Sequence, residues 1–316
     1  MLVFRGLPAH ADVSSVLTIG NFDGVHRGHQ ALLERLVRVA RERALPATVL
    51  TFEPHPREFF APDSAPPRLS RLREKLELLA EAGVDRVFII PFDAALAALE
   101  AEAFIEQVLV RALGTRYLLI GDDFCFGRAR RGNFAMLQDS GRSLGFQVES
   151  MPTLVFEGER VSSSAVRETL MAGDLEHAER LIGRPYTMSG RVMHGDKLGR
   201  TLGFPTANIQ IKRSKSPLMG IFTVTVDGLA DAPWPGVASL GVRPTVTSSG
   251  RATLEVFLFD FDGDLYGRHL RVNFLHKQRD EAKFDSLDAL KAAIWRDCDI
   301  AREILAQRRI QVPTVV

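Results

Sequence analysis

The sequence contains only two cysteines, Cys125 and Cys298, which lie far apart and match no metal-binding spacing. This excludes a scaffold of several disulfides and a zinc cluster built on cysteine. Long hydrophobic runs are missing as well, because no apolar stretch approaches the ~18 residues that a transmembrane helix needs. The first residues lack the apolar centre and the cleavage site of a secretory signal. We therefore expect a cytoplasmic protein with no membrane partner.

An excess of charge of either sign is also lacking, since 40 Lys and Arg residues stand against 39 Asp and Glu residues. The net charge of +1 gives no reason to expect a polyanionic partner, so we expect no nucleic-acid partner and only local basic sites. The length of 316 residues is too great for one ordinary core and predicts two domains. The sequence does not determine oligomeric state, and a homo-oligomer is compatible with it.

The first part of the chain, up to about Gly183, alternates between short apolar strands and amphipathic helices. Repeated βα units of this length predict an α/β fold with a doubly wound parallel sheet, in a domain of residues 1–183. Ligands of such folds bind beyond the carboxyl ends of the strands. The expected strands are Val16–Ile19, Thr48–Phe52, Arg86–Pro91, Tyr117–Gly121 and Gln147–Met151, and the expected helices are Gln30–Val39, Ser70–Ala82, Ala94–Leu113 and Phe134–Leu144.

The remaining residues, 184–316, show strand-like runs separated by turn residues. This pattern predicts a second domain, a small antiparallel β-barrel or sandwich followed by a terminal helix. The expected strands are Ile221–Val226, Gly236–Leu240, Leu254–Phe259 and Leu270–Phe274. The helix is expected over Ser286–Arg308, with one apolar face made of Leu287, Leu290, Ile294, Cys298, Ala301 and Leu305.

The segment TIGNFDGVHRGH, residues 18–29, joins the first strand to the first helix and holds three glycines and two histidines. Glycines allow backbone N–H groups to approach a ligand, and a helix N-terminus carries partial positive charge, so the expected ligand is a phosphate. His26 and His29 are three residues apart and should place both rings on one side of the first helical turn. A helix cap with two solvated histidines is the alternative, which the glycines and the preceding strand disfavour.

A second segment, VSSSAVRETL, places serines before another helix and an arginine one turn into it. Ser163 and Ser164 offer hydroxyl donors, and Arg167 could reach an anion at that helix end. The alternative is an ordinary serine cap with a solvated arginine. Together with the first motif, the segment suits a triphosphate ligand.

A third segment, HGDKLGRTLGFPTAN, contains glycines at 195, 199 and 203 but has no Walker A spacing. Thr206 and Asn208 share one face if the chain is extended there. Their neutral oxygens suit Mg²⁺ bound together with substrate phosphates. A glycine-rich barrel turn is the alternative.

The sequences GNFDGVHRGH and SSSAVR resemble the two signatures of the adenylyltransferase module of bacterial bifunctional riboflavin kinase/FAD synthetases. They also resemble the HIGH and KMSKS elements of the wider nucleotidyltransferase superfamily. The resemblance implies that His26 and His29 stabilise the phosphates of ATP and that Ser163, Ser164 and Arg167 contact them from the other side. The phosphate of FMN would attack the α-phosphorus of ATP, forming FAD and pyrophosphate. The resemblance also places Gly20, Phe22, Asp23, Gly24 and Asp123 near the nucleotide, and His55 and Phe60 near the flavin.

The segment GFPTAN resembles the PTAN signature of riboflavin kinases. This implies that the second domain is a flavokinase-like antiparallel β-barrel in which Thr206 and Asn208 hold Mg-nucleotide. The preceding loop, with Gly195, Lys197, Gly199, Gly203 and Pro205, would cover its phosphates. The glutamate base of the family corresponds to Glu255. Ser239 stands where members commonly have Asn, and we expect this departure to alter flavin or loop packing at most.

The hypothesis from the sequence is a bifunctional enzyme that uses ATP to convert riboflavin to FMN and FMN to FAD. Two alternatives remain open at this point. One is an enzyme with a single active module. The other is a non-catalytic flavin- or RNA-binding regulator that reuses the barrel, although RNA binding calls for a clustered basic face with exposed aromatic residues.

Overall fold

The computed structural model describes residues 1–194, 203–213, 215–242 and 252–311. Its contacts divide the chain into two compact units, Met1–Pro66 with Ser70–Ser163, and Pro67–Leu69 with Ser164–Val316. Within the described ranges, no helix combines the length and the apolar character needed to cross a bilayer.

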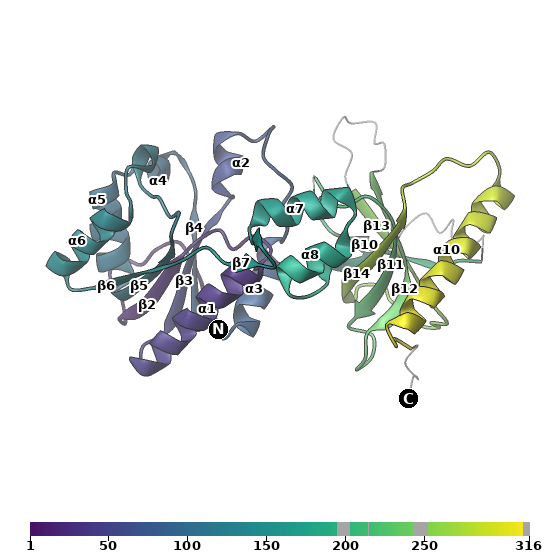
Figure 1. Ribbon diagram of the computed structural model, residues 1–316, viewed down its shortest axis with the longest axis horizontal. Coiled ribbons are helices and arrows are strands. Elements are labelled where there is room, and N and C mark those ends of the chain that lie inside the picture. Colours follow the sequence, from purple (N-terminus) through teal and green to yellow (C-terminus); the bar gives the residue numbers. More distant parts are fainter. Residues whose placement is uncertain (195–202, 214, 243–251, 312–316) are drawn as a thin grey trace. The chain divides into compact units, whose positions relative to one another are not determined.

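The first unit is built on a six-stranded parallel sheet with the strand order β1-β4-β3-β2-β5-β6 (Figure 1). The doubly wound α/β fold expected from the sequence is therefore confirmed. The order reverses around β2, so the carboxyl end of β2 lies where such sheets bind ligands. The strands are β1 Leu2–Arg5, β2 Ser15–Ile19, β3 Ala47–Glu53, β4 Arg86–Pro91, β5 Thr115–Gly121 and β6 Gln147–Met151.

Helices cover both faces of this sheet, and each face has its own hydrophobic core. Alternate residues of a strand point to opposite faces, so Val16 of β2 joins one core and Leu17 joins the other. The first core contains buried residues of α1, Arg27–Glu42, and α3, Leu72–Glu81. The second contains buried residues of the π-helix η1, Phe104–Ala112, and of α6, Phe134–Leu144. The remaining short elements are α2 Pro56–Phe60, α4 Ala94–Ala98, α5 Ala101–Ala103, η2 Arg128–Arg130, β7 Val155–Phe156 and β8 Glu159–Arg160.

Two features of this unit differ from the sequence prediction. The edge strand β1 was missed because Leu2 and Val3 are exposed and gain strand geometry only by pairing with β4. The single helix predicted over Ala94–Leu113 is wrong, because Leu99 is extended and divides it. The Leu99 carbonyl accepts a hydrogen bond from Arg128 N (2.8 Å), a tertiary contact that helical periodicity does not reveal.

The second unit contains a closed antiparallel barrel with the strand order β10-β13-β12-β11-β14-β9 (Figure 1). The strand pattern alone left barrel and sandwich open, whereas the family resemblance implied a flavokinase-like barrel, and the barrel is confirmed. Successive side chains of a strand point to opposite sides of the barrel wall, and along β13 buried residues alternate strictly with half-buried ones. Helix α7 begins at Ser163, the last residue of the first unit. The elements are α7 Ser163–Ala172, α8 Leu175–Ile182, β9 Tyr186–Met193, β10 Thr206–Gln210, β11 Gly220–Asp227, β12 Trp234–Val242, β13 Ala252–Leu258, β14 His269–Arg279 and α10 Leu287–Gln307.

Helix α10 packs on the outside of the barrel against β11 and β12. Cys298, Ala301 and Leu305 are buried in that contact, as the apolar pattern predicts. Leu287 is 59% exposed, so its assignment to the buried face is wrong. Burial of Asp297 was not predicted, because a carboxylate enters a core only when a tertiary partner compensates its charge.

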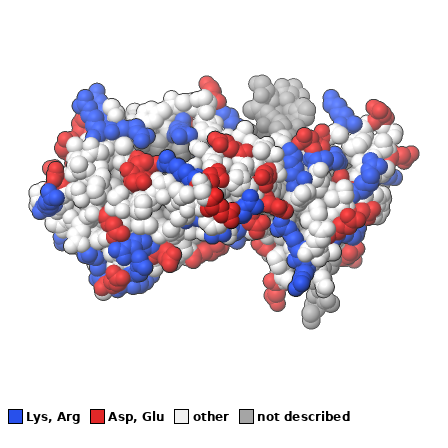
Figure 2. Space-filling view, viewed as in Figure 1, with Lys and Arg blue, Asp and Glu red and all other residues white. Residues whose placement is uncertain are grey.

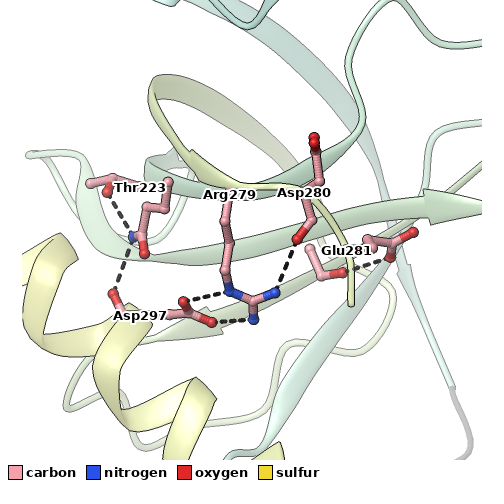
Figure 3. Close-up of polar contacts among 7 residues, drawn as sticks. Thr223, Arg279, Asp280, Glu281 and Asp297 are labelled. Atoms are coloured by element: carbon pink, nitrogen blue, oxygen red, sulfur yellow. Dashed lines mark hydrogen bonds and ion pairs between the residues drawn. The ribbon is translucent and has the colours of Figure 1, made fainter. Parts of the chain in front are cut away.

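The partner of Asp297 is Arg279, at the end of β14 (Figure 3). Its Nε and Nη2 atoms donate to the two carboxylate oxygens at 2.9 and 2.6 Å. The Asp297 backbone carbonyl also accepts from Gln278 Nε2 at 3.1 Å. This bidentate ion pair therefore fastens α10 to the barrel.

We expect Asp297→Ala to destabilise the barrel unit by about 3 kcal/mol, because the substitution leaves a partly buried guanidinium without its partner. Chemical unfolding of the full chain, followed separately for each unit, measures the change. The double variant Arg279→Leu/Asp297→Leu should recover part of the loss, since neither side chain then carries an unpaired charge. A transition of the barrel unit that Asp297→Ala leaves unmoved would contradict this role.

Candidate active sites

The loop between β2 and α1 has an unusual backbone. Phe22 and Val25 adopt positive φ angles of 47° and 41°, a conformation that costs ~1–3 kcal/mol for each non-glycine residue. Gly24, with φ 82°, adopts it without a side-chain clash. Gly20 donates its N–H to the Leu50 carbonyl (3.1 Å), and a Cβ there would lie 3.1 Å from the Phe22 ring. The buried side chains of Phe22 and Val25 hold this strained conformation, which is typical of functional loops.

The two histidines of the first motif lie against each other at the start of α1. Their ring centroids are 3.7 Å apart, with an angle of 20° between the ring planes, so the prediction that both rings lie on one side of the first turn is confirmed. His26 is the N-cap, and its Nδ1 accepts a hydrogen bond from His29 N at 3.4 Å. The Phe22 ring covers His29 with a centroid distance of 5.1 Å.

The environment of His29 opposes protonation of its ring. Burial lowers the pKa of His29 well below its usual value, and the charges of His26 and Lys75 lower the pKa further. The Nδ1 atom of His29 is buried and has no hydrogen-bond partner among the described residues. At neutral pH the ring is therefore a neutral imidazole, which still carries one N–H donor.

Asp23 ties the loop to two distant segments. Its buried carboxylate accepts hydrogen bonds from the backbone N (2.9 Å) and hydroxyl (3.3 Å) of Ser70, and the Ser70 hydroxyl accepts from Gly24 N at 2.9 Å. The Ser163 hydroxyl donates to the Asp23 carbonyl at 3.0 Å. The structure thus brings Ser163 of the second motif to the histidine loop. The contacts also show that Asp23 and Ser163 hold the loop in place, and their contact with a nucleotide stays a prediction.

Ser164 and Arg167 belong to the second unit. Arg167 is buried on α7, and its Nε donates to the Pro67 carbonyl at 2.7 Å. The alternative of a solvated arginine is therefore wrong, because Arg167 is buried and bonded to Pro67 of its own unit. Phosphate binding by Ser164 and Arg167 stays a prediction.

The residues predicted near the flavin lie after β3. His55 caps α2, since its Nδ1 accepts from Arg57 N at 3.1 Å. Phe60 is 67% exposed and makes edge-on contacts with Phe59 and Phe92, with centroid distances of 5.2 and 5.6 Å. An exposed cluster of three aromatic rings at the carboxyl end of the sheet could pack against a planar ligand.

Asp123 lies in the loop after β5. It is exposed and forms an ion pair with Arg160 of the β7–β8 hairpin, with an N–O distance of 2.8 Å. The neighbouring Asp122 carboxylate instead accepts hydrogen bonds from the backbone N–H (2.8 Å) and the hydroxyl (2.7 Å) of Thr153. The two aspartates therefore differ. Asp122 stabilises the loop, and Asp123 remains accessible from solvent, as a nucleotide contact requires.

The barrel places its candidate residues in one row on its outer surface. On β10, Thr206 and Asn208 are half-buried and point outward, while the intervening Ala207 points into the core. The shared face predicted for Thr206 and Asn208 is confirmed. Asn208 lies directly opposite Glu255 of β13 in the strand register. Cβ atoms of directly opposed residues are about 5 Å apart, so an amide and a carboxylate meet here.

Ser239 extends this row on β12, because it is the residue opposite Glu255 on its other side. The Ser239 hydroxyl donates to Glu281 Oε1 at 3.4 Å (Figure 3). Four polar side chains, those of Asn208, Glu255, Ser239 and Glu281, therefore follow one another across the barrel surface. Ser239, which stands where family members commonly have Asn, thus lies beside the candidate base Glu255. The spacing of the two residues in the sequence did not indicate that they are neighbours.

An aromatic group adjoins the row at the Thr206 end. Phe257, opposite Thr206, contacts the buried Phe204 edge-on at 5.4 Å, and Phe204 contacts Trp295 of α10 at 4.9 Å. Trp295 is 55% exposed and offers an indole face to solvent. Gly203, with φ 89°, and Pro205 lead into β10 and are exposed. The predicted phosphate-covering residues Gly195, Lys197 and Gly199 lie outside the described residues.

Comparison with known proteins accounts for both units. Residues 9–165 match the FAD synthetase family, and residues 182–305 match the riboflavin kinase family. The bifunctional riboflavin kinase/FMN adenylyltransferase of Escherichia coli strain K12 is 54% identical over 288 residues, which cover 91% of this chain and 92% of that protein. The chain belongs to this bifunctional family. The family member from Pseudomonas fluorescens is 51% identical over 310 residues, covering 97% of this chain and 98% of that protein.

A solved structure, described as a macrolide-efflux protein from Streptococcus pneumoniae, has the same fold. It is 28% identical, with a TM-score of 0.81 over 96% of this chain and 99% of that one. The likeness spans both units of this family member, the parallel sheet and the barrel alike.

Sequence reasoning missed several residues at the candidate sites of this riboflavin kinase/FMN adenylyltransferase family member. Ser70 comes to the histidine loop from the segment before α3, and Lys75 of α3 donates to Thr51 on β3; no motif spacing indicates either residue. Glu281 and Trp295 come to the barrel row from the end of the chain.

Proposed function

We propose that the chain phosphorylates riboflavin with ATP on the barrel and adenylylates FMN with a second ATP on the parallel sheet. The proposal extends to this chain the two activities for which the family is named. The observation that carries it is the presence of a separate polar constellation on each fold, His26 with His29 and Ser163 on one, and Asn208 with Glu255 on the other.

In the adenylyl transfer, an FMN phosphate oxygen forms a bond to the α-phosphorus of ATP while the bond to the leaving pyrophosphate breaks. The protein contributes by positioning the reactants and by donating hydrogen bonds to oxygens that gain charge. The neutral His29 ring supplies one donor, and the strained loop that holds Gly24 supplies backbone N–H groups at the N-terminus of α1. Ser164, Arg167 and Asp123 complete the proposed nucleotide contacts, and His55 and Phe60 the flavin contacts.

In the kinase reaction, the ribityl hydroxyl of riboflavin attacks the γ-phosphorus of ATP and ADP leaves. Glu255 orients this hydroxyl and accepts its proton. The oxygens of Thr206 and Asn208, on the same face, are neutral hard donors of the kind that Mg²⁺ takes together with substrate phosphates. Mg²⁺ bound with ATP would neutralise phosphate charge there. The exposed Trp295 offers a surface for the flavin ring.

The proposal keeps the finer predictions from the sequence. The adenylyltransferase domain spans residues 1–183 and the kinase domain 184–316, although the contacts group α7 and α8 with the barrel. The partners are the small molecules ATP, riboflavin and FMN, the location is the cytoplasm, and no nucleic acid is bound. Figure 2 shows Lys and Arg side chains interspersed with Asp and Glu on the face in view, which supports the last point.

A chromatographic time course of the protein with riboflavin, ATP and Mg²⁺ tests the proposal. We expect FMN to appear first and FAD to follow, and Asn208→Ala to form FAD only from supplied FMN. Formation of FMN alone would identify an enzyme with one active module. Flavin binding without ATP turnover would favour a non-catalytic regulator.

A further inference from the structure

A cavity of about 440 Å³ lies in the barrel unit, between the C-terminal end of α10 and the start of β12. Its apolar walls are Pro235 of β12, Phe259 directly after β13, Leu305 and Ala306 of α10, and Ile310. Phe259 and Leu305 are 2% and 3% exposed and belong to the hydrophobic core beneath α10. The volume falls in the range of roughly 300–1,000 Å³ that small-molecule sites occupy.

Two arginines also line this cavity, and no acidic residue does. The Arg302 guanidinium of α10 lies 4.4 Å from the centre of the Phe259 ring, above its face. A guanidinium that stacks on a ring keeps its N–H groups at its edge, where they can donate to an anion. Arg309, just after α10, is exposed at the cavity.

The neighbouring Arg308 shows the contrast with an arginine that has a structural partner. Its guanidinium lies 3.4 Å from the carboxylate of Glu179 and 3.7 Å from that of Glu176, both on α8. Arg302 and Arg309 form no such ion pair with any residue that the structure describes. The positive charge at the cavity is therefore available to a ligand.

The aromatic wall of the cavity is held in place from the barrel side. The Phe259 carbonyl accepts a hydrogen bond from Trp234 Nε1 at 2.7 Å, and Phe259 N donates to the Pro235 carbonyl at 3.0 Å. At the end of α10, Ile310 N donates to the Leu305 carbonyl at 2.9 Å. A wall that is fixed before binding lowers the entropy lost when a ligand binds.

The cavity is separate from the polar row on the barrel surface. None of its lining residues belongs to that row. An aromatic contact joins the two places, because Phe259 meets Phe257 edge-on at 6.0 Å and Phe257 lies opposite Thr206. The substrates proposed for the row therefore do not account for the cavity.

We propose that this cavity binds a small amphipathic organic anion. The apolar part of such a ligand packs on Phe259, Leu305 and Ile310, and its carboxylate, phosphate or sulfonate group accepts hydrogen bonds from Arg302 and Arg309. A neutral apolar ligand would leave both guanidinium groups without a partner, and an inorganic anion would leave the apolar wall in water. Binding at this cavity is independent of the proposed function.

Binding can be measured with 8-anilinonaphthalene-1-sulfonate, an aromatic sulfonate whose fluorescence rises in apolar surroundings. We expect saturable binding of one probe to each whole chain, weakened by added salt because salt screens charges at an exposed site. The carboxylates 4-phenylbutyrate and octanoate should displace the probe, and the more effective of the two shows whether the apolar part is aromatic or aliphatic. The amine 4-phenylbutylamine, which has the opposite charge, should not. Displacement by the amine as readily as by the carboxylates, or the absence of saturable binding, would overturn the inference.

Two variants separate the charged and the apolar part of the site. In Arg302→Gln/Arg309→Gln, which removes the charges, the dissociation constant of the probe should rise by about tenfold or more. Ala306→Phe, which fills the cavity and keeps both charges, should weaken binding to a similar extent. Arg296→Gln and Ala292→Phe are the matched controls, because both positions are exposed on α10 and do not line the cavity, and they should bind the probe as the parent does.

Equal affinity in all of these proteins would show that the probe binds elsewhere. Loss of binding in Ala306→Phe alone, with the double Gln variant unchanged, would show an apolar cavity without anion recognition. Either result contradicts the inference. Far-UV circular dichroism reports whether each variant folds. If one does not, the salt dependence and the competition between carboxylates and amine in the parent protein still decide the outcome.

Other occupants of the cavity give different results. Displacement of the probe by riboflavin or ATP would place it on the polar row, whatever reaction occurs there. Removal of residues 312–316, which lie outside the described residues, should leave the affinity unchanged, and a gain of about tenfold would show that the chain itself fills the cavity. A lower sedimenting mass after addition of the probe would identify a second copy of the chain as the occupant. Each of these three results would overturn the inference.

Discussion

Substitution of Glu255 by Gln should lower the rate of riboflavin phosphorylation by about 10²- to 10⁴-fold, the usual effect of losing a general base. The amide has the shape of the carboxylate but cannot accept the proton of the attacking hydroxyl. Glu255 lies on β13 between Asn208 and Ser239, and the substitution leaves both of these neighbours of the row unchanged. The loss should therefore appear mainly in kcat.

Initial rates of FMN formation, measured by chromatography, give this result directly, and adenylylation of supplied FMN in the same sample should keep its parent rate. Glu281→Gln is the matched control. Glu281 is an exposed carboxylate at the far end of the row from Asn208, where it accepts a hydrogen bond from Ser239, so its loss should cost much less. Phosphorylation at the parent rate by Glu255→Gln would show that the base assignment is wrong.

Substitution of His29 by Ala should lower the rate of FMN adenylylation by about 10²- to 10³-fold, the effect of removing one preorganised donor to a developing charge. The ring lies against His26 and Phe22, so its removal also leaves a gap at the start of α1. His29→Asn should recover part of the rate, because an amide N–H can donate in place of the imidazole. FMN should accumulate from riboflavin in both variants.

His10→Ala serves as the control, because His10 is an exposed histidine of the same unit and should leave both reactions unchanged. Accumulation of FMN with a normal kinase rate separates loss of the donor from unfolding of the chain. Adenylylation by His29→Ala at the parent rate would remove His29 from the site.

Motif spacing was sufficient to predict which side chains lie together at both candidate sites. The glycines and histidines after β2 are close in sequence, so local geometry alone stacks His26 on His29. The same holds for Thr206 and Asn208, which share a face because β10 is extended. Glu255 was named through family resemblance, and it lies opposite Asn208 because strand register joins β10 to β13.

The sequence by itself determined the fold class, the order of the main elements and the residues next to each motif, because hydrophobic periodicity and short-range geometry depend only on neighbours along the chain. The tertiary structure alone decided the rest. Ser70 reaches the histidine loop, Glu281 reaches Ser239, and Asp297 is buried against Arg279. Each of these contacts joins segments that packing brings together, and the burial of a charge depends on a partner that no local pattern specifies.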